Sequence, residues 1–354
     1  MDGALLGLLR EALWGVSCHE DISPKEAYRL INIARQQAVA GLIIDALIKK
    51  DVRMDQKVLF EAIACLEQIK QENRLMNQEV ATFARMMEDA EVDYMVVKGQ
   101  TLAALYAEPL ARMPGDIDFL VNDYQQASKV LKAQWGVELP GRIAEKEVSF
   151  AHGTALYELH TYLIDFGSNR HRRYWENALA KSKPSYIIID GEEVRTMEPT
   201  LYAAYVFLHL FFHFVHEGIG LRHLCDWAVM MHHYADEIDS QRLSEVLKNV
   251  GMLKAFRAFG TILVDQLGMA DFPLPLSAKD RKLQSKILKD IMRGGNFGRD
   301  KRCVRHVGWR YKAETMLLTL SNSTGYVTLA PLEMALMLYR RVVVNMKLIT
   351  FQKK

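Results

Sequence analysis

Cysteine, charge imbalance and long apolar segments are all scarce in this sequence, and each absence excludes a class of protein. The four cysteines form no C-x-x-C pair, so the sequence predicts neither a zinc knuckle nor a disulfide framework. Reduced thiols are typical of cytosolic proteins, and we expect a cytoplasmic location. No window reaches the roughly 18–20 uncharged apolar residues of a membrane span. The first residues carry no basic segment, so no signal peptide is predicted. The cysteines are Cys18, Cys65, Cys225 and Cys303.

The charge balance also excludes a function. The chain has 45 Lys and Arg residues against 43 Asp and Glu residues, and its formal net charge is +2, which excludes a general polyanion binder. Half of its 354 residues are hydrophobic, which is enough for the cores of two or three domains. No internal repeat or low-complexity tract is present.

A strand, a glycine turn, a short helix and a second strand are predicted over residues 94–121. The second strand carries Asp116 and Asp118, and residues two apart on a strand point to the same face. Neighbouring carboxylates repel each other unless a cation lies between them. Two-metal phosphoryl-transfer sites hold their ions roughly 3.5–4 Å apart with shared carboxylates. Because Mg²⁺ favours carboxylates together with phosphate oxygens, the pair predicts two Mg²⁺ ions.

The turn at Lys98 and Gly99 predicts a phosphate site beside those ions. A helix from Thr101 to Ala107 would direct its free N–H groups beyond the end of the first strand. Lys98 and Arg112 add positive charge, and an arginine grips phosphate with two N–H groups. A D-x-D pair alone is weak evidence, since most such pairs lie on surfaces or in turns. The combination with an apolar strand and a glycine turn favours a functional site.

These residues resemble a known family. The pattern K-G…Y-x-x-P-x-x-R-x-x-x-D-I-D-F-L-V is similar to the uncharacterised bacterial branch of the nucleotidyltransferase superfamily, which has the polymerase-beta-like fold. The resemblance covers about residues 90–235, and its pattern residues are Lys98, Gly99, Tyr106, Pro109, Arg112, Asp116 and Asp118. Two departures are visible: Gln100 stands where the superfamily often has Ser or Gly, and the gap from Gly99 to Asp116 is longer than in the simplest members.

The resemblance implies a set of site residues and co-substrates. It implies an NTP as co-substrate and a third carboxylate on a later strand, for which Glu158 is the closest candidate. The E-L-H stretch around Glu158 also resembles the family, and alternation places Glu158 and His160 on one face of their strand. The implied catalytic and metal-binding residues are Asp116, Asp118 and Glu158. The implied nucleotide-binding residues are Lys98, Gly99, Gln100, Thr101, Arg112 and Arg222.

Residues 24–91 are predicted to be helical, because apolar residues recur at spacings of three and four. Ser23 followed by Pro24 is typical of a helix start. Two successive apolar stripes predict two further helices, both facing the core. The first stripe is Val58, Ile63, Leu66 and Ile69, and the second is Leu75, Val80, Phe83, Met86 and Met87.

Two hairpins are predicted after a helix at residues 123–133. One pairs residues 148–152 with residues 156–163 around Gly153. The other pairs residues 186–189 with residues 193–195 around an Asp-Gly turn, which is a strong hairpin signal. A mixed sheet with flanking helices follows.

The chain is predicted to be helical again from residue 199. His209, His213 and His216 lie on one face of the first of these helices. Zinc binding is one interpretation, but no carboxylate or cysteine completes a recognised spacing, and packed histidines or a cleft lining are the alternatives. Arg222 and Asp226 are four residues apart. They form either a helix salt bridge or a site in which Arg222 faces phosphates.

Two basic segments lie near the C-terminus. The stretch from Arg293 to Lys312 interleaves basic and aromatic residues, which grip single-stranded nucleic acid in some proteins, although a solvated loop is favoured here. The last predicted helix, Pro331 to Leu348, is basic and amphipathic, and we expect it to pack on the protein rather than on a membrane.

Together these observations predict an α+β protein. A small mixed-sheet nucleotidyltransferase-like core at residues 92–197 would lie between an N-terminal helical region, 1–91, and a C-terminal helical domain, 198–354. The predicted function is Mg²⁺-dependent transfer of an NMP from an NTP to the hydroxyl of an acceptor, which could be a small molecule, a protein or an RNA. The alternatives are a non-catalytic nucleotide-binding scaffold and a toxin-like transferase that acts on RNA.

Overall fold

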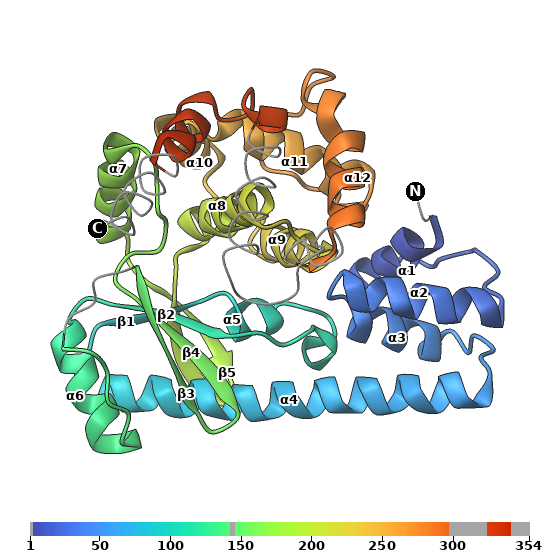
Figure 1. The fold of residues 1–354 in the computed structure, drawn as a ribbon, viewed down its shortest axis with the longest axis horizontal. Coiled ribbons are helices and arrows are strands. Elements are labelled where there is room, and N and C mark those ends of the chain that lie inside the picture. The colour runs from blue at the N-terminus through green and yellow to red at the C-terminus, as the bar shows by residue number, and fades with distance from the viewer. Residues whose placement is uncertain (1–2, 142–145, 297–323, 341–354) are drawn as a thin grey trace, which may run out of the picture.

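The protein is an α+β molecule in which helices surround a small sheet (Figure 1). A computed structural model describes residues 3–141, 146–296 and 324–340. The sheet has four strands in the order β1-β2-β4-β3, with β2 and β4 parallel and the other pairs antiparallel, which confirms the predicted mixed sheet. Its strands are β1 (Tyr94–Val97), β2 (Ile117–Val121), β3 (Glu147–His152) and β4 (Ala155–His160).

The two predicted hairpins are confirmed. β3 and β4 are joined at Gly153, and this turn pairs Glu147 with His160 at the far end of the hairpin. A separate two-stranded sheet consists of β5 (Ser185–Ile189) and β6 (Glu192–Thr196). Its turn residues Asp190 and Gly191 both have positive φ, 51° and 83°, as a tight two-residue hairpin loop requires.

The helical segment before β1 differs from the prediction in its length. Residues 56–89 form one helix, α4 (Gln56–Asp89), instead of two. The segment contains neither Gly nor Pro, so nothing in the backbone ends the helix between its two apolar stripes. At 34 residues the helix is about 51 Å long, and it runs beneath both the sheet and the N-terminal helices (Figure 1). The expectation that Ile63 is a core residue is wrong, since its side chain is exposed.

The remaining helices enclose the sheet and extend the molecule in both directions. Ser23 caps α2 and accepts a hydrogen bond from the Glu26 N–H at 3.3 Å, which confirms the predicted helix start. The helix expected over 101–107 ends at Ala103. The helices are α1 (Gly3–Trp14), α2 (Pro24–Gln36), α3 (Ala40–Lys49), α5 (Gln100–Ala103), η1 (Pro109–Ala111), α6 (Tyr124–Trp135), α7 (Asn169–Ala180), α8 (Pro199–His216), α9 (Leu221–His233), α10 (Ser240–Asn249), α11 (Leu253–Asp265), η2 (Asp280–Leu283) and α12 (Gln284–Gly294).

Two predicted basic segments are described only in part. Residues 331–340 are helical, as expected for the start of the last helix, and its remainder lies outside the described residues. Most of the basic and aromatic stretch from 293 to 312 also lies outside them. Within the part of the chain that the structure describes, no helix is both long enough and apolar enough to cross a membrane.

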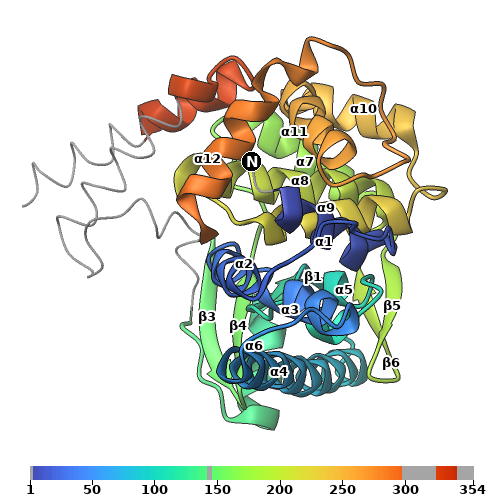
Figure 2. The ribbon, with the colours of Figure 1, turned by 90° about the vertical axis from the view of Figure 1, so that its right-hand side faces the viewer.

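The N-terminal and C-terminal helices share one hydrophobic core. Figure 2 looks onto α1 to α3, with α4 below them and α9 to α12 above. The Trp14 indole N–H donates to the Leu267 carbonyl at 2.6 Å. The buried Gln37 side chain accepts from the Leu221 N–H at 3.2 Å and donates to the Met292 carbonyl at 3.2 Å. The N-terminal helices therefore fix the start of α9, while a second core joins the sheet to α4 and α6.

Candidate functional site

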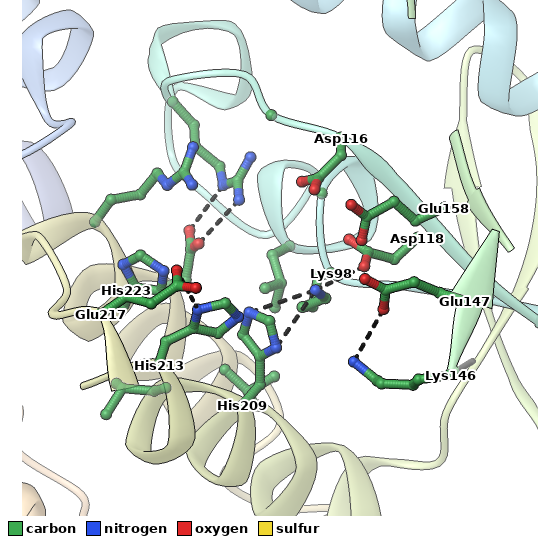
Figure 3. Close-up of a pocket in the computed structure, with 18 residues that line it drawn as sticks. Lys98, Asp116, Asp118, Lys146, Glu147, Glu158, His209, His213, Glu217 and His223 are labelled. Carbon is green, nitrogen blue, oxygen red and sulfur yellow. Dashed lines mark hydrogen bonds and ion pairs between the residues drawn. The ribbon is translucent and has the colours of Figure 1, made fainter. Parts of the chain in front are cut away.

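A pocket opens between one end of the sheet and the helices α8 and α9 (Figure 3). One wall comes from the β1–α5 turn and from β2, β3 and β4, and the other from α8 and α9. Six carboxylates and four cationic side chains line it, so its net formal charge is −2 when the histidines are neutral. The lining residues are Lys98, Gly99, Leu102, Arg112, Gly115, Asp116, Asp118, Lys146, Glu147, Glu158, Val206, His209, Leu210, His213, Glu217, Arg222, His223 and Asp226.

The turn at Lys98 and Gly99 has a backbone shape that few sequences tolerate. Both residues have positive φ, 64° and 51°. A Cβ added at Gly99 would lie 2.9 Å from the carbonyl oxygen of Asp116, so glycine fits both the conformation and the close approach. The hydroxyl of Tyr202, on α8, accepts the Lys98 N–H at 3.2 Å. The turn is therefore held by α8 and directs the Lys98 side chain into the pocket.

The acidic wall is built by strand register. Asp118 on β2 lies directly beside Glu158 on β4 in the parallel pair, so both side chains project from the same face. The Asp118 side chain is 1% exposed, and its Oδ1 accepts from Lys98 Nζ at 2.8 Å and from His160 Nε2 at 2.9 Å. His160 Nε2 also lies 3.7 Å from Glu158 Oε2.

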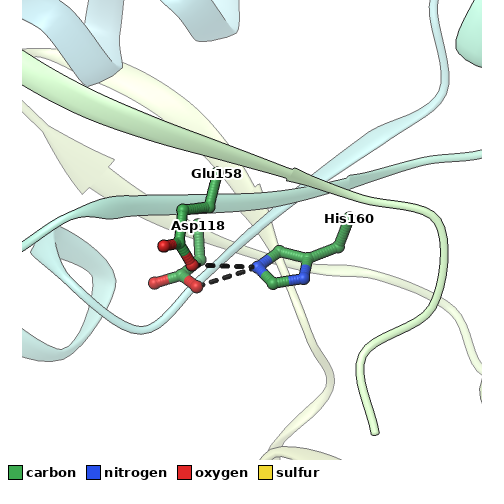
Figure 4. A group of neighbouring side chains, drawn as sticks. All are labelled: Asp118, Glu158 and His160. Atoms are coloured by element: carbon green, nitrogen blue, oxygen red, sulfur yellow. Dashed lines mark hydrogen bonds and ion pairs between the residues drawn. The ribbon is translucent and has the colours of Figure 1, made fainter. Parts of the chain in front are cut away.

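Asp118, Glu158 and His160 form a candidate metal site (Figure 4). One ligand atom from each lies within 4.8 Å of the others. Asp116, which directly precedes β2, lines the same wall but falls outside this compact group. The ligand set implied by the family resemblance was Asp116, Asp118 and Glu158, without His160. Carboxylate oxygens and an imidazole nitrogen suit a divalent cation, and the crowding of negative charge favours one.

The pKa values of the two central carboxylates are pushed in opposite directions. Burial, followed by the charges of Asp118, Asp116 and Glu147, raises the pKa of Glu158 to about 8. Burial also acts to raise the pKa of Asp118, but Lys98 and the hydrogen bond from His160 outweigh it, and the pKa lies well below its usual range. The free site therefore favours ionisation of Asp118 and disfavours ionisation of Glu158, as expected where a cation is needed.

The opposite wall carries three imidazoles, and two of them belong to the predicted histidine face. His209 and His213 line the pocket from α8 and are joined there by His223 from α9, whereas His216 does not line it. Both ring nitrogens of His209 lie 3.4 Å from Lys98 Nζ. Burial and then Lys98 hold the pKa of His209 well below its usual value, and burial and then Arg222 do the same for His223. These two rings are neutral.

Of the two alternatives for Arg222 and Asp226, the salt bridge does not form. Asp226 instead accepts two hydrogen bonds from the buried Arg112, at 2.7 and 2.9 Å, and one from the Tyr106 hydroxyl at 2.7 Å. Arg222 donates to the carbonyl of Pro114 at 3.0 Å and has no carboxylate within ion-pair distance among the described residues. Burial and then the charge of Arg112 lower the pKa of Arg222. Arg222 therefore presents a positive charge without a direct carboxylate partner among the described residues, whereas Arg112 is paired with Asp226.

Two residues predicted to bind nucleotide do not reach the pocket. Gln100 is buried and donates to the Asn77 side chain on α4. Thr101 is also buried, and its hydroxyl donates to the Lys98 carbonyl and contacts the Tyr202 hydroxyl, both at 2.7 Å. Both side chains support the turn from behind.

Several lining residues were missed by the sequence reasoning. Glu147 is the clearest case, because a two-residue turn at Gly153 and Thr154 would have paired it with His160 by counting back along the hairpin. Its Oε2 lies 3.2 Å from His160 Nδ1 and 3.2 Å from Lys146 Nζ. No local signal in the sequence identifies His223 or Glu217.

The family of the chain follows from comparison with known proteins. None of the curated proteins searched matches the chain. The chain is similar to a solved structure, that of an antigenic nucleotidyltransferase-like protein from Paracoccidioides brasiliensis, with 14% sequence identity and a TM-score of 0.30. The alignment covers 57% of this chain and 93% of that chain, and a likeness at this level carries no argument. The sequence profile of the family described as uncharacterised nucleotidyltransferase matches residues 23–267. That match includes the whole sheet, the acidic cluster and both pocket-lining helices, and the chain belongs to the uncharacterised nucleotidyltransferase family.

Proposed function

We propose that the protein transfers an NMP from an NTP to the hydroxyl of an acceptor, with divalent metal ions bound at the acidic wall. The observation that carries this proposal is a single pocket with two chemistries. Asp118 and Glu158 crowd two carboxyl groups on one side, while Arg222 has no carboxylate partner among the described residues on the other. A metal–triphosphate complex matches this arrangement, because its cations meet the carboxylates and its phosphates meet the guanidinium.

The acidic wall would hold the metal. Asp118, Glu158 and His160 are the compact ligand group, and Asp116 lies on the same wall for a second ion. Bound divalent ions neutralise phosphate charge and lower the pKa of an attacking hydroxyl. The chain's own contribution is to fix these carboxylates on adjacent strands before the substrate arrives, which reduces the reorganisation needed in the transition state.

The other residues would place the phosphates. Arg222 and Lys98 both reach the pocket, and Gly99 has no side chain to obstruct a close approach. Arg112 acts indirectly, since its ion pair with Asp226 and the bonds from Arg222 to the loop before β2 fix the segment that carries Asp116. This positioning role replaces the direct phosphate contact first predicted for Arg112.

The acceptor would enter beside α8. His209, His213 and Glu217 line that side of the pocket, opposite the carboxylates. Their chemistry suits hydrogen bonding to a hydroxyl-bearing acceptor, and a small molecule, a protein or an RNA would each supply one. The basic stretch that would favour RNA lies mostly outside the described residues.

Isothermal titration with each of the four NTPs and Mg²⁺ tests the proposal. We expect binding to the wild-type protein that requires Mg²⁺ and disappears in Asp116→Ala/Asp118→Ala. The matched control is Asp236→Ala/Asp271→Ala, which removes two exposed carboxylates that do not line the pocket. Folded wild-type protein that binds none of the four NTPs would contradict the proposal. Binding without transfer to any acceptor would support a nucleotide-binding scaffold.

A further inference from the structure

We infer that Lys98 is an exchangeable counter-ion, which holds Asp118 in the free protein and passes to the phosphates of the nucleotide when a divalent ion takes its place. This inference rests on the proposed function, because it assigns the order in which the same pocket is filled. It adds a coupling between metal and nucleotide that the acidic cluster alone does not imply.

The first ground is where the Lys98 ammonium lies. Its Nζ is 2.8 Å from Asp118 Oδ1, the carboxylate at the centre of the candidate metal site (Figure 3). The same oxygen already accepts from His160 Nε2 at 2.9 Å. A divalent ion on Asp118 would lie within a few ångströms of the ammonium, and two positive charges at that separation repel strongly where water is largely excluded. The ion and the ammonium therefore compete for Asp118.

The second ground is that the backbone of Lys98 is fixed by contacts that do not involve its ammonium. The Lys98 N–H is bonded to the Tyr202 hydroxyl, and its carbonyl accepts from the Thr101 hydroxyl and the Thr101 N–H. Tyr202 and Thr101 are fully buried. Beyond this anchor a lysine has a flexible four-carbon stem, so its ammonium can change partner without moving the turn.

The third ground is that Lys98 has no second strong partner within the described pocket. Its other neighbour is the ring of His209 at 3.4 Å, which is neutral. A neutral imidazole stabilises an ammonium less than a carboxylate does, so metal alone leaves the lysine poorly compensated. A triphosphate supplies the missing negative charge. Metal and nucleotide should therefore bind together, each raising the affinity for the other.

The test measures Mn²⁺ binding without nucleotide, by the EPR signal of the free ion. Lys98→Met should bind Mn²⁺ at least tenfold more tightly than the wild type, because the competitor is gone. Lys146→Met is the matched control: it removes a second ammonium from the pocket, one paired with Glu147, and should change the affinity less than threefold. Adding Asp118→Asn to Lys98→Met should abolish the gain. Lys98→Gln replaces Lys98→Met if the latter fails to fold.

A second measurement follows the amine itself. Acetylation of Lys98, read by peptide mass spectrometry, should become at least fivefold faster at saturating Mn²⁺ and slow again when inorganic tripolyphosphate is added. Unchanged or weaker Mn²⁺ binding in Lys98→Met, or a Lys98 acetylation rate that Mn²⁺ does not raise, would overturn the inference. Neither readout requires turnover, so the two proposals can fail separately. If the wild type transfers NMP but Lys98→Met binds Mn²⁺ no more tightly than the wild type, only the exchange of Lys98 between Asp118 and the phosphates is refuted. Tighter binding without any transfer refutes only the proposed function.

Discussion

Substituting Asp226 by Asn should destabilise the protein strongly, because this carboxylate neutralises a buried charge. Asp226 accepts two hydrogen bonds from Arg112 and one from the Tyr106 hydroxyl, at 2.7 to 2.9 Å. The side chains of Arg112 and Asp226 are 4% and 9% exposed, so solvent cannot compensate for the lost partner. Removing one member of such a buried pair costs about 3–5 kcal/mol in free energy of unfolding.

The chain offers a matched exposed pair as the control. Arg281 also grips Asp265 with two nitrogens, at 2.8 and 3.2 Å, but these side chains are 40% and 26% exposed. Because exposed ion pairs contribute about 0–1 kcal/mol, Asp265→Asn should cost little. Urea denaturation gives the free energy of unfolding of both variants. Equal losses in Asp226→Asn and Asp265→Asn would refute the argument from burial.

The pH dependence of the same variant provides an independent check. Burial alone would raise the pKa of Asp226, but Arg112 outweighs burial and the pKa is lowered. A carboxyl group whose pKa is lower in the folded state contributes stability above its unfolded pKa, about 3.9, and loses it as the pH falls through the folded value. The stability difference between wild type and Asp226→Asn should therefore be constant near neutrality and shrink below about pH 4. A difference that grew on acidification would contradict this sign.

Three further predictions concern the metal site, the turn and the C-terminal helix. Because the pKa of Glu158 is about 8 in the free protein, the Mn²⁺ affinity of the wild type should rise with pH up to about that value. Mn²⁺ binding should also release protons, which titration calorimetry in two buffers measures. The absence of proton release would count against Glu158 as a ligand. Gly99→Ala should lower the free energy of unfolding by about 1–3 kcal/mol, measured by thermal denaturation, since the new Cβ would lie 2.9 Å from the Asp116 carbonyl oxygen. The loss should be smaller for Gly136→Ala, where φ is +67° but nothing lies within 4 Å of the new Cβ. Glu333→Gln should make residues 331–340 more sensitive to limited proteolysis. The buried Glu333 carboxylate accepts from the Gly167 N–H at 2.6 Å and from the Ser168 N–H at 3.1 Å, and so anchors this helix. An unchanged pattern of proteolytic fragments would refute this anchoring role.

The strands and the two hairpins were predictable because their signals are local. The apolar runs at 94–97 and 117–121 and the glycine turns at Gly153 and Gly191 determined both hairpins and the mixed sheet. Alternation along β4 correctly placed Glu158 and His160 together, and their side chains meet Asp118 as register requires. Burial of Phe119 also followed from alternation.

Other features depended on contacts between distant parts of the chain, which no local pattern encodes. The partner of Asp226 is Arg112, which lies 114 residues earlier in the chain. Because α9 packs against the loop before β2, Asp226 pairs with Arg112 while the nearby Arg222 bonds to the carbonyl of Pro114. Gln100 was assigned to the pocket by analogy, yet the buried Asn73 and the half-buried Asn77 of α4 provide it with polar partners on the opposite side. The division at residues 91 and 197 stays a prediction.

The shared core of the outer helices has a consequence for the synthesis of the chain. Besides packing on one another and on α4, α1 to α3 contribute to a core that they share with helices beginning roughly 150 residues later, at α8. At translation rates of about 5–20 residues per second, that shared part of the core forms no earlier than about 8–30 s after α3 is synthesised. Contacts of such long sequence separation also form slowly once the chain is complete. The N-terminal helices therefore complete their packing only after the helices from α8 onward have been made.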